Sequence, residues 1–180
     1  MNWKTLATEY ISKHLYFTAR KDKCEMPDGK IVDAYFVVEY QASVCAMAIT
    51  ETGNVLMVKQ YRHPIKATIL EIPGGFVDEG EEPHTAIARE LLEETGHEFS
   101  SIELVGKVAA NPGILSGFTY LYLAQGGKKI ASLSLDASED IEVIEKPLNE
   151  VRSMLRENKI VQALHLSCLM YAFQKLDEQK

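Results

Sequence analysis

Apolar positions in the first 40 residues predict a short N-terminal element followed by a β-hairpin. Residues 2–12, which include Trp3 and Ile11, are expected to form a short helix or turn. Residues 14–24 and 30–40 have the β-branched and aromatic content of strands. A Met-Pro-Asp-Gly stretch separates them, in which Pro fixes φ and Gly permits a positive φ, so the chain is expected to reverse direction there.

Further along the chain, short apolar runs predict more strands, and longer periodic runs predict helices. The run at residues 42–49 is almost continuously apolar, as expected for a strand buried on both faces. Strands are expected over residues 43–50, 54–61, 68–72, 101–109, 118–124 and 141–144, and helices over residues 83–95, 151–157 and 161–174. Strands interleaved with so few helices indicate a mixed sheet, in an α/β or α+β domain.

The segment 83–95 combines the ends of a helix with an unusual concentration of acid. It begins with Pro and is followed by Gly, both typical of helix boundaries. At about 100° per residue, Glu90, Glu93 and Glu94 share one arc of the helix. The residues expected to face the core are Ile87, Ala88, Leu91, Leu92 and Thr95.

Two interpretations of this acidic arc are open from the helix alone. Carboxylates spaced by four residues repel each other by a few tenths of a kcal/mol, so their clustering suggests a ligand. A set of oxygen donors suits a hard divalent cation such as Mg²⁺. The alternative is a solvated acidic face on which Arg89 makes a local salt bridge.

Composition and charge are those of one folded domain of 180 residues. Hydrophobic residues make up 46% of the chain, and 26 acidic against 19 basic residues give a net charge of −7. The acidic excess argues against a nucleic-acid or anionic-membrane binder. Three cysteines without metal-ligand spacing are expected to be reduced and buried, and Glu9 with no apolar core argues against a signal peptide, so a cytoplasmic location is expected.

The residues before the acidic helix connect it to a known pattern. Residues 75–96 contain G-x5-E-x7-R-E-U-x-E-E-x-G, where U is apolar. This resembles the signature of the Nudix hydrolases. The one departure is the last position, usually apolar in that signature, which is His97 here.

The resemblance implies a fold, a reaction and a cofactor. The implied fold is an α/β/α sandwich around a mixed β-sheet, here with the N-terminal hairpin as an extension. The implied reaction is hydrolysis of the pyrophosphate in a nucleoside diphosphate linked to another moiety. It would depend on Mg²⁺, with Mn²⁺ as a substitute. The implied metal ligands are Gly74, through its carbonyl, Glu90, Glu93 and Glu94, and the implied catalytic residues are Arg89, Glu93, Glu94 and Glu139.

Several further segments resemble the ADP-ribose pyrophosphatase branch of that family. These are residues 58–62, 71–75, 111–113 and 139–141, and Pro112 follows Gly96 by 16 residues, within the spacing of that branch. The implied substrate-binding residues are Arg62, Gly75, Pro112 and Gly113. Arg62 could otherwise be a surface charge at the end of a strand.

The resemblance also implies an organisation of the chain. Residues 1–180 are expected to form one domain, with residues 1–40 as a helix/hairpin extension that supports a homodimer and residues 41–180 as the core. The expected partners are the nucleoside diphosphate sugar and a second copy of the chain, with no nucleic acid and no membrane.

Two departures from the branch leave the substrate open. Residues 112–118 lack the acid that the branch usually places there, which keeps GDP-mannose or a similar compound as an alternative. The loop before residue 141 holds Asp136, Glu139 and Asp140, of which Glu139 is preferred as the catalytic base. A catalytically silent domain that senses a nucleotide is the remaining alternative.

Overall fold

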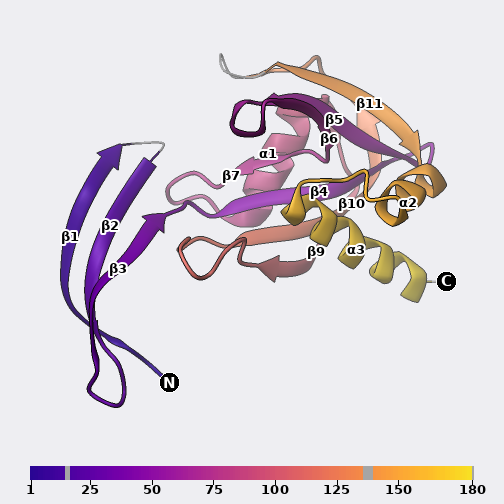
Figure 1. Cartoon of the computed structure of the whole chain (residues 1–180). Helices are drawn as coiled ribbons and strands as arrows, with labels where there is room; N and C mark the ends of the chain where they lie inside the picture. Colours follow the sequence, from indigo (N-terminus) through magenta and orange to yellow (C-terminus); the bar gives the residue numbers. More distant parts are fainter. Residues whose placement is uncertain (15–16, 136–139, 180) are drawn as a thin grey trace. The chain divides into compact units, whose positions relative to one another are not determined.

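The computed structural model describes residues 1–14, 17–135 and 140–179 (Figure 1), and the chain divides into two compact units. The first unit consists of Met1–Gln41 and Ala109–Phe118, and the second of Ala42–Val108 and Thr119–Lys180. Asp136 and Glu139 lie outside the described residues. No helix in the described ranges is long and apolar enough to span a membrane.

The first unit contains an antiparallel sheet of three strands in the order β1-β2-β3. The strands are β1 (Lys4–His14), β2 (Phe17–Glu25) and β3 (Ile31–Glu39). The expected hairpin is present as β2 and β3. The helix or turn expected over residues 2–12 is wrong, because β1 pairs with β2 from Lys4 opposite Glu25 to His14 opposite Phe17, with two register shifts, at Leu6 and Ile11. Backbone pairing with a neighbouring strand overrides the weak helical spacing of its apolar residues.

The loop of the first unit, Ala109–Phe118, runs along β3. The N–H of Val38 donates to the carbonyl of Ile114 at 2.8 Å, and the N–H of Ser116 donates to the carbonyl of Val38 at 3.1 Å. The hydroxyl of Tyr35 donates to the carbonyl of Gly113 at 3.0 Å. Backbone bonds therefore attach this loop to β3 of the N-terminal sheet.

The second unit is built on a mixed sheet. Its main path is β11-β5-β4-β10-β8, and β6, β7 and β9 pair with β5, β4 and β10. The strands are β4 (Ser43–Thr50), β5 (Asn54–Arg62), β6 (Ala67–Glu71), β7 (Gly74–Phe76), β8 (His97–Glu98), β9 (Ser101–Val108), β10 (Thr119–Lys129) and β11 (Ile141–Pro147). Strands β4 and β10 are parallel, whereas the other pairs are antiparallel.

Helices cover both faces of this sheet, which confirms the expected α/β/α arrangement. The helices are η1 (His63–Ile65), α1 (Pro83–Thr95), α2 (Leu148–Arg156) and α3 (Ala163–Glu178). All eight residues of β4 are buried. Its odd-numbered residues, such as Met47, pack in a core with Leu169 of α3, and its even-numbered residues, such as Val44, pack in a second core with Ile87 of α1. This alternation explains why the sequence of β4 is almost continuously apolar.

Candidate active site

The face that α1 turns toward the sheet is partly the expected one, because Ile87, Leu91 and Thr95 are buried as predicted. Ala88 is exposed and Leu92 is 37% exposed, so their assignment to the core is wrong. Glu90 and Glu94 are instead only 9% and 5% exposed. They lie on the same side of the helix as the fully buried Ala86, at a spacing of four residues. Carboxylates are buried only where partners satisfy them, so the surroundings of this face decide its chemistry.

Two glycines let β7 lie between β4 and α1. A Cβ on Gly75 would be 2.3 Å from Oε1 of Glu90, and a Cβ on Gly74 would be 2.2 Å from the carbonyl oxygen of Val44. A side chain at position 74 would therefore meet backbone, and one at position 75 would displace the carboxylate of Glu90. The Gly-Gly pair therefore brings a strand backbone directly against the acidic face of the helix.

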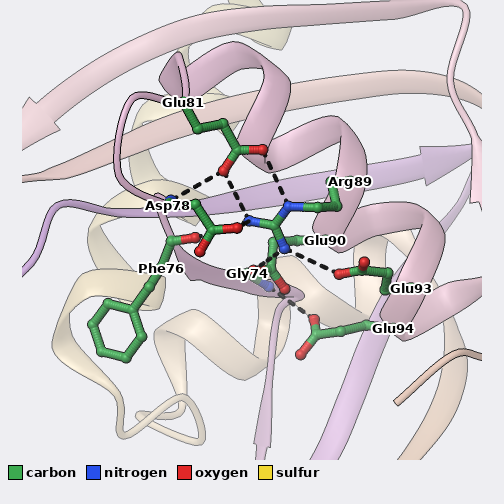
Figure 2. A network of polar contacts seen from close by, with 8 residues as sticks. All are labelled: Gly74, Phe76, Asp78, Glu81, Arg89, Glu90, Glu93 and Glu94. Carbon is green, nitrogen blue, oxygen red and sulfur yellow. Dashed lines mark hydrogen bonds and ion pairs between the residues drawn. The ribbon is translucent and has the colours of Figure 1, made fainter. Parts of the chain in front are cut away.

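Arg89 joins the carboxylates into one network (Figure 2). Its Nε and Nη2 donate to the two oxygens of Glu81 at 3.1 and 3.0 Å. Its Nη1 donates to Oε1 of Glu90 at 2.9 Å and to Oε2 of Glu93 at 3.0 Å, and Nη2 also donates to the carbonyl of Phe76 at 3.1 Å. The guanidinium thus lies between Glu81 and the helix carboxylates and offsets their mutual repulsion.

The charged groups of this network shift each other's pKa values. Hydrogen bonds from Arg89 hold the pKa of Glu81 below its usual range. The pKa of Arg89 is raised in turn, chiefly by its hydrogen bonds to Glu81. Glu81 also accepts the N–H of Asp78 at 3.1 Å, which fixes the loop before α1 to the same network.

Glu94 is held by a different partner. Its Oε2 accepts the backbone N–H of Gly74 at 2.9 Å, as the lower dashed line of Figure 2 shows. Glu93 is the most exposed of the three, with a side chain 39% exposed. The three carboxylates of the predicted metal site therefore lie on one face of α1, but in three different environments.

The donor chemistry of this face fits a hard divalent cation. Carboxylate and backbone oxygens are the ligands that Mg²⁺ prefers. Among the described residues, no group of three acidic, His or Cys side chains is gathered as a ready metal site. Arg89 and the Gly74 N–H occupy oxygens that a cation would also use.

His97, the departure from the signature, is accommodated by burial. It is 7% exposed, and its Nδ1 lies 2.8 Å from the carbonyl oxygen of Thr95. The position after the helix, usually apolar in the signature, is therefore filled by a buried imidazole with a hydrogen-bond partner.

Arg62 binds Glu71, which lies in one of the segments that resemble the family branch but was not predicted to have a role in the site. Its Nε and Nη2 lie 2.9 and 2.8 Å from Oε2 of Glu71, the last residue of β6. Glu71 is 1% exposed, and next to it lies the buried His165 of α3. The signal that could have found Glu71 is its place as the one acid within the apolar run at residues 69–72.

The remaining predicted residues lie elsewhere in the chain. Pro112 and Gly113 belong to the first unit, in the loop that runs along β3. The preferred base, Glu139, and its alternative Asp136 fall outside the described residues, whereas Asp140 is exposed just before β11. The structure therefore brings together Gly74, Gly75, Arg89, Glu90, Glu93 and Glu94.

The chain matches two family models and aligns with known proteins over most of its length. Residues 39–163 match the model described as NUDIX domain, and residues 3–38 match the model described as nucleoside diphosphate sugar hydrolase N-terminal domain. A methanol dehydrogenase activator of Bacillus methanolicus is 33% identical over 93% of this chain and 91% of that protein. An ADP-ribose pyrophosphatase of Bacillus subtilis (strain 168) is 30% identical over the same shares. A crystal structure of an ADP compounds hydrolase has the same fold, with a TM-score of 0.87 over 99% of this chain and 96% of that one, at 22% identity.

Proposed function

The chain belongs to the Nudix family, as a nucleoside diphosphate sugar hydrolase of that family, and from this premise we propose that it hydrolyses ADP-ribose in a Mg²⁺-dependent reaction. Water adds its oxygen to one phosphorus of the pyrophosphate, and the bond from that phosphorus to the bridging oxygen breaks. The products are AMP and ribose phosphate. The bridging oxygen leaves with the second phosphate, and the protons of water go to a carboxylate base and to solvent.

The observation that supports this proposal is the acidic face of α1 packed against the two glycines of β7. Glu90, Glu93 and Glu94 would hold Mg²⁺ together with the carbonyl of Gly74. When bound, Mg²⁺ supplies positive charge against the pyrophosphate oxygens and acidifies a water molecule. Arg89 holds Glu90 and Glu93 in position at 2.9 and 3.0 Å, so their geometry is set before the substrate arrives.

Further residues would complete the reaction. We assign the role of base to Glu139, with Asp136 and Asp140 as the alternatives. Gly75, Pro112 and Gly113 would contact the substrate through their backbones. Arg62, with a side chain 44% exposed, would contact a substrate phosphate or sugar.

ADP-ribose is proposed as the substrate because of a similar protein with that named activity. A relative aligned over 93% of this chain is named an ADP-ribose pyrophosphatase. Residues 112–118 lack an acid that could hold the ribose, so we expect other nucleotide sugars to be cleaved as well. GDP-mannose and similar compounds belong in the same test.

The experiment is a substrate screen with the purified chain. ADP-ribose, other nucleoside diphosphate sugars and nucleoside triphosphates are offered with Mg²⁺, and released monophosphate is measured. ADP-ribose is expected to have the highest kcat/KM and the triphosphates the lowest. A triphosphate preferred over every nucleotide sugar would overturn the assignment of substrate class. Tight binding of a nucleotide sugar without product would instead favour a sensor.

A further inference from the structure

The pair formed by Arg62 and Glu71 is asymmetric in its exposure. The side chain of Arg62 is 44% exposed, whereas that of Glu71 is 1% exposed. The carboxylate is therefore a fixed internal group, and the guanidinium extends from it toward solvent.

One oxygen of Glu71 makes both contacts to Arg62, and the other makes none. Oε2 lies 2.9 Å from Nε and 2.8 Å from Nη2 of Arg62. Oε1 is buried without a hydrogen-bond partner among the described residues. A buried carboxylate with an unsatisfied oxygen is costly, and replacing such a pair by apolar residues often stabilises a fold, so the pair needs a reason other than stability.

His165 cannot replace Arg62 as the cation that compensates Glu71. Its Nδ1 is 4.0 Å from Oε1 of Glu71 and accepts the backbone N–H of Ile72 at 3.4 Å, so this nitrogen carries no proton. Burial, and secondarily the charge of Arg62, lowers the pKa of His165 to about 3. Among the described residues, Arg62 is thus the one cation bonded to Glu71.

The guanidinium keeps one nitrogen available. Nε and Nη2 are engaged by Glu71, and Nη1 makes no hydrogen bond or ion pair with any described residue. A guanidinium fixed on one edge presents its remaining N–H groups in a set direction, and phosphate oxygens are the acceptors that suit this geometry.

We propose that Glu71 is a positioning residue that orients Arg62 so that its Nη1 binds a phosphate oxygen of the nucleoside diphosphate substrate. The inference rests on the proposed function, because it gives that substrate a contact outside the acidic face of α1. It predicts that Glu71 acts on substrate affinity and acts only through Arg62.

A double-mutant cycle tests this dependence. E71Q keeps the size of the side chain and removes its charge, and it is expected to raise KM for the nucleotide sugar about tenfold with kcat changed less than about threefold. R62A is expected to raise KM at least as much. Adding E71Q to R62A is expected to have no further effect on KM, because Glu71 then has nothing left to orient.

Two further variants separate positioning from folding. E71D keeps the charge and shortens the side chain by one methylene, so it is expected to raise KM like E71Q and to serve if E71Q does not fold. R62K keeps the positive charge but lacks the planar guanidinium with its several N–H donors. Its KM is therefore expected to stay raised, as in R62A. The matched control is E142Q, which breaks the exposed pair between Lys59 of β5 and Glu142 at 2.8 Å and is expected to leave KM unchanged.

The outcomes distinguish this inference from the proposed function. A wild-type chain that cleaves no nucleotide sugar overturns both. A wild-type chain that cleaves one, with additive KM effects of R62A and E71Q, overturns the positioning role alone. A fall in kcat without a change in KM, in either Glu71 variant that folds, also overturns it.

Discussion

Glu94 of α1 accepts a hydrogen bond from the backbone N–H of Gly74 in β7, with 2.9 Å between Oε2 and N. The bond ties the C-terminal half of the helix to the glycine pair of β7. A glutamine at position 94 can still accept this N–H through its amide oxygen, so charge can be removed here without losing the tie.

The first prediction follows from that distinction. E94Q is expected to lower kcat by roughly 10²–10⁴, the scale for losing a key charged group, because a neutral amide is a poor ligand for Mg²⁺. Its thermal unfolding is expected to match the wild type. The control is E82Q at the exposed start of the same helix, whose side chain makes no capping bond. Activity of E94Q within about threefold of wild type would refute the role of Glu94 as ligand.

The two glycines of β7 are expected to respond differently to alanine. The Cβ of G75A would meet Oε1 of Glu90 at 2.3 Å, and a flexible side chain can move away. G75A should therefore fold nearly as well as wild type but lose roughly 10²-fold in kcat, since Glu90 is displaced. The Cβ of G74A would meet the carbonyl oxygen of Val44 at 2.2 Å, which is backbone. G74A should lose about 2 kcal/mol or more of unfolding free energy. Urea denaturation and steady-state kinetics on both variants provide the comparison, and equal stability losses would contradict it.

Arg89 is expected to matter more when the cation is absent. R89M removes the donor shared by Glu81, Glu90 and Glu93 and should lower stability by about 1–3 kcal/mol in chelator. A bound cation stabilises the folded state by mass action and offsets part of the repulsion. Adding Mg²⁺ should therefore raise the melting temperature of R89M more than that of wild type. An equal shift in both proteins would show that Arg89 and the cation do not share these carboxylates.

The buried His165 predicts a loss of stability in mild acid. Its pKa is about 3 in the folded chain and near 6.5 when unfolded, because burial disfavours the charged ring. Above pH 6.5 the ring is neutral in both states. As the pH falls from 6.5 toward 3, the unfolded chain binds a proton that the folded chain does not, which costs about 1.4 kcal/mol per pH unit. Urea denaturation at pH 7 and pH 5 should show a smaller loss in H165Q than in wild type, whereas the exposed-site control H63Q should behave like wild type.

The exposed strand β1 predicts self-association. Ten of its eleven residues are exposed, and these include the large apolar side chains of Leu6, Tyr10 and Ile11. Exposed apolar surface of this kind favours an interface, so light scattering is expected to give twice the 20.2 kDa of one chain. The double variant L6S/I11S should shift the mass toward one chain, with E9Q on the same strand as the control. A wild-type mass of one chain at micromolar concentration would refute the homodimer.

The bounds of α1 were predictable from the sequence, but the burial of Glu90 and Glu94 on its acidic face was not. The bounds of α1 follow from Pro83 and Gly96, whose effects on the backbone are local. Glu90 is buried against a residue without a side chain, Gly75, whereas the apolar periodicity of the helix pointed to Ala88 and Leu92. Only packing against Gly75 reveals that Glu90 lies inside.

Long-range pairing explains the other differences. The strand β1 depends on β2 for its backbone partners, and its own sequence carries a competing helical pattern. Glu71 and His165 are brought together by β6 and α3, and no spacing in the sequence links them. The motif from Gly74 to Glu94 could be recognised because its residues lie close together in sequence, in β7, α1 and the loop between them.

The loop Ala109–Phe118 bears on how such a chain can be divided or recombined. It is inserted between β9 and β10 of the second unit, yet its backbone bonds go to Val38 of the first. Deleting residues 1–41 would remove the hydrogen-bond partner of this loop. Transferring those residues alone to another protein would leave the N–H and carbonyl of Val38 without the hydrogen bonds that the loop provides. A functional exchange of this extension between relatives must therefore transfer two distant stretches of sequence together, so the two are expected to change in concert.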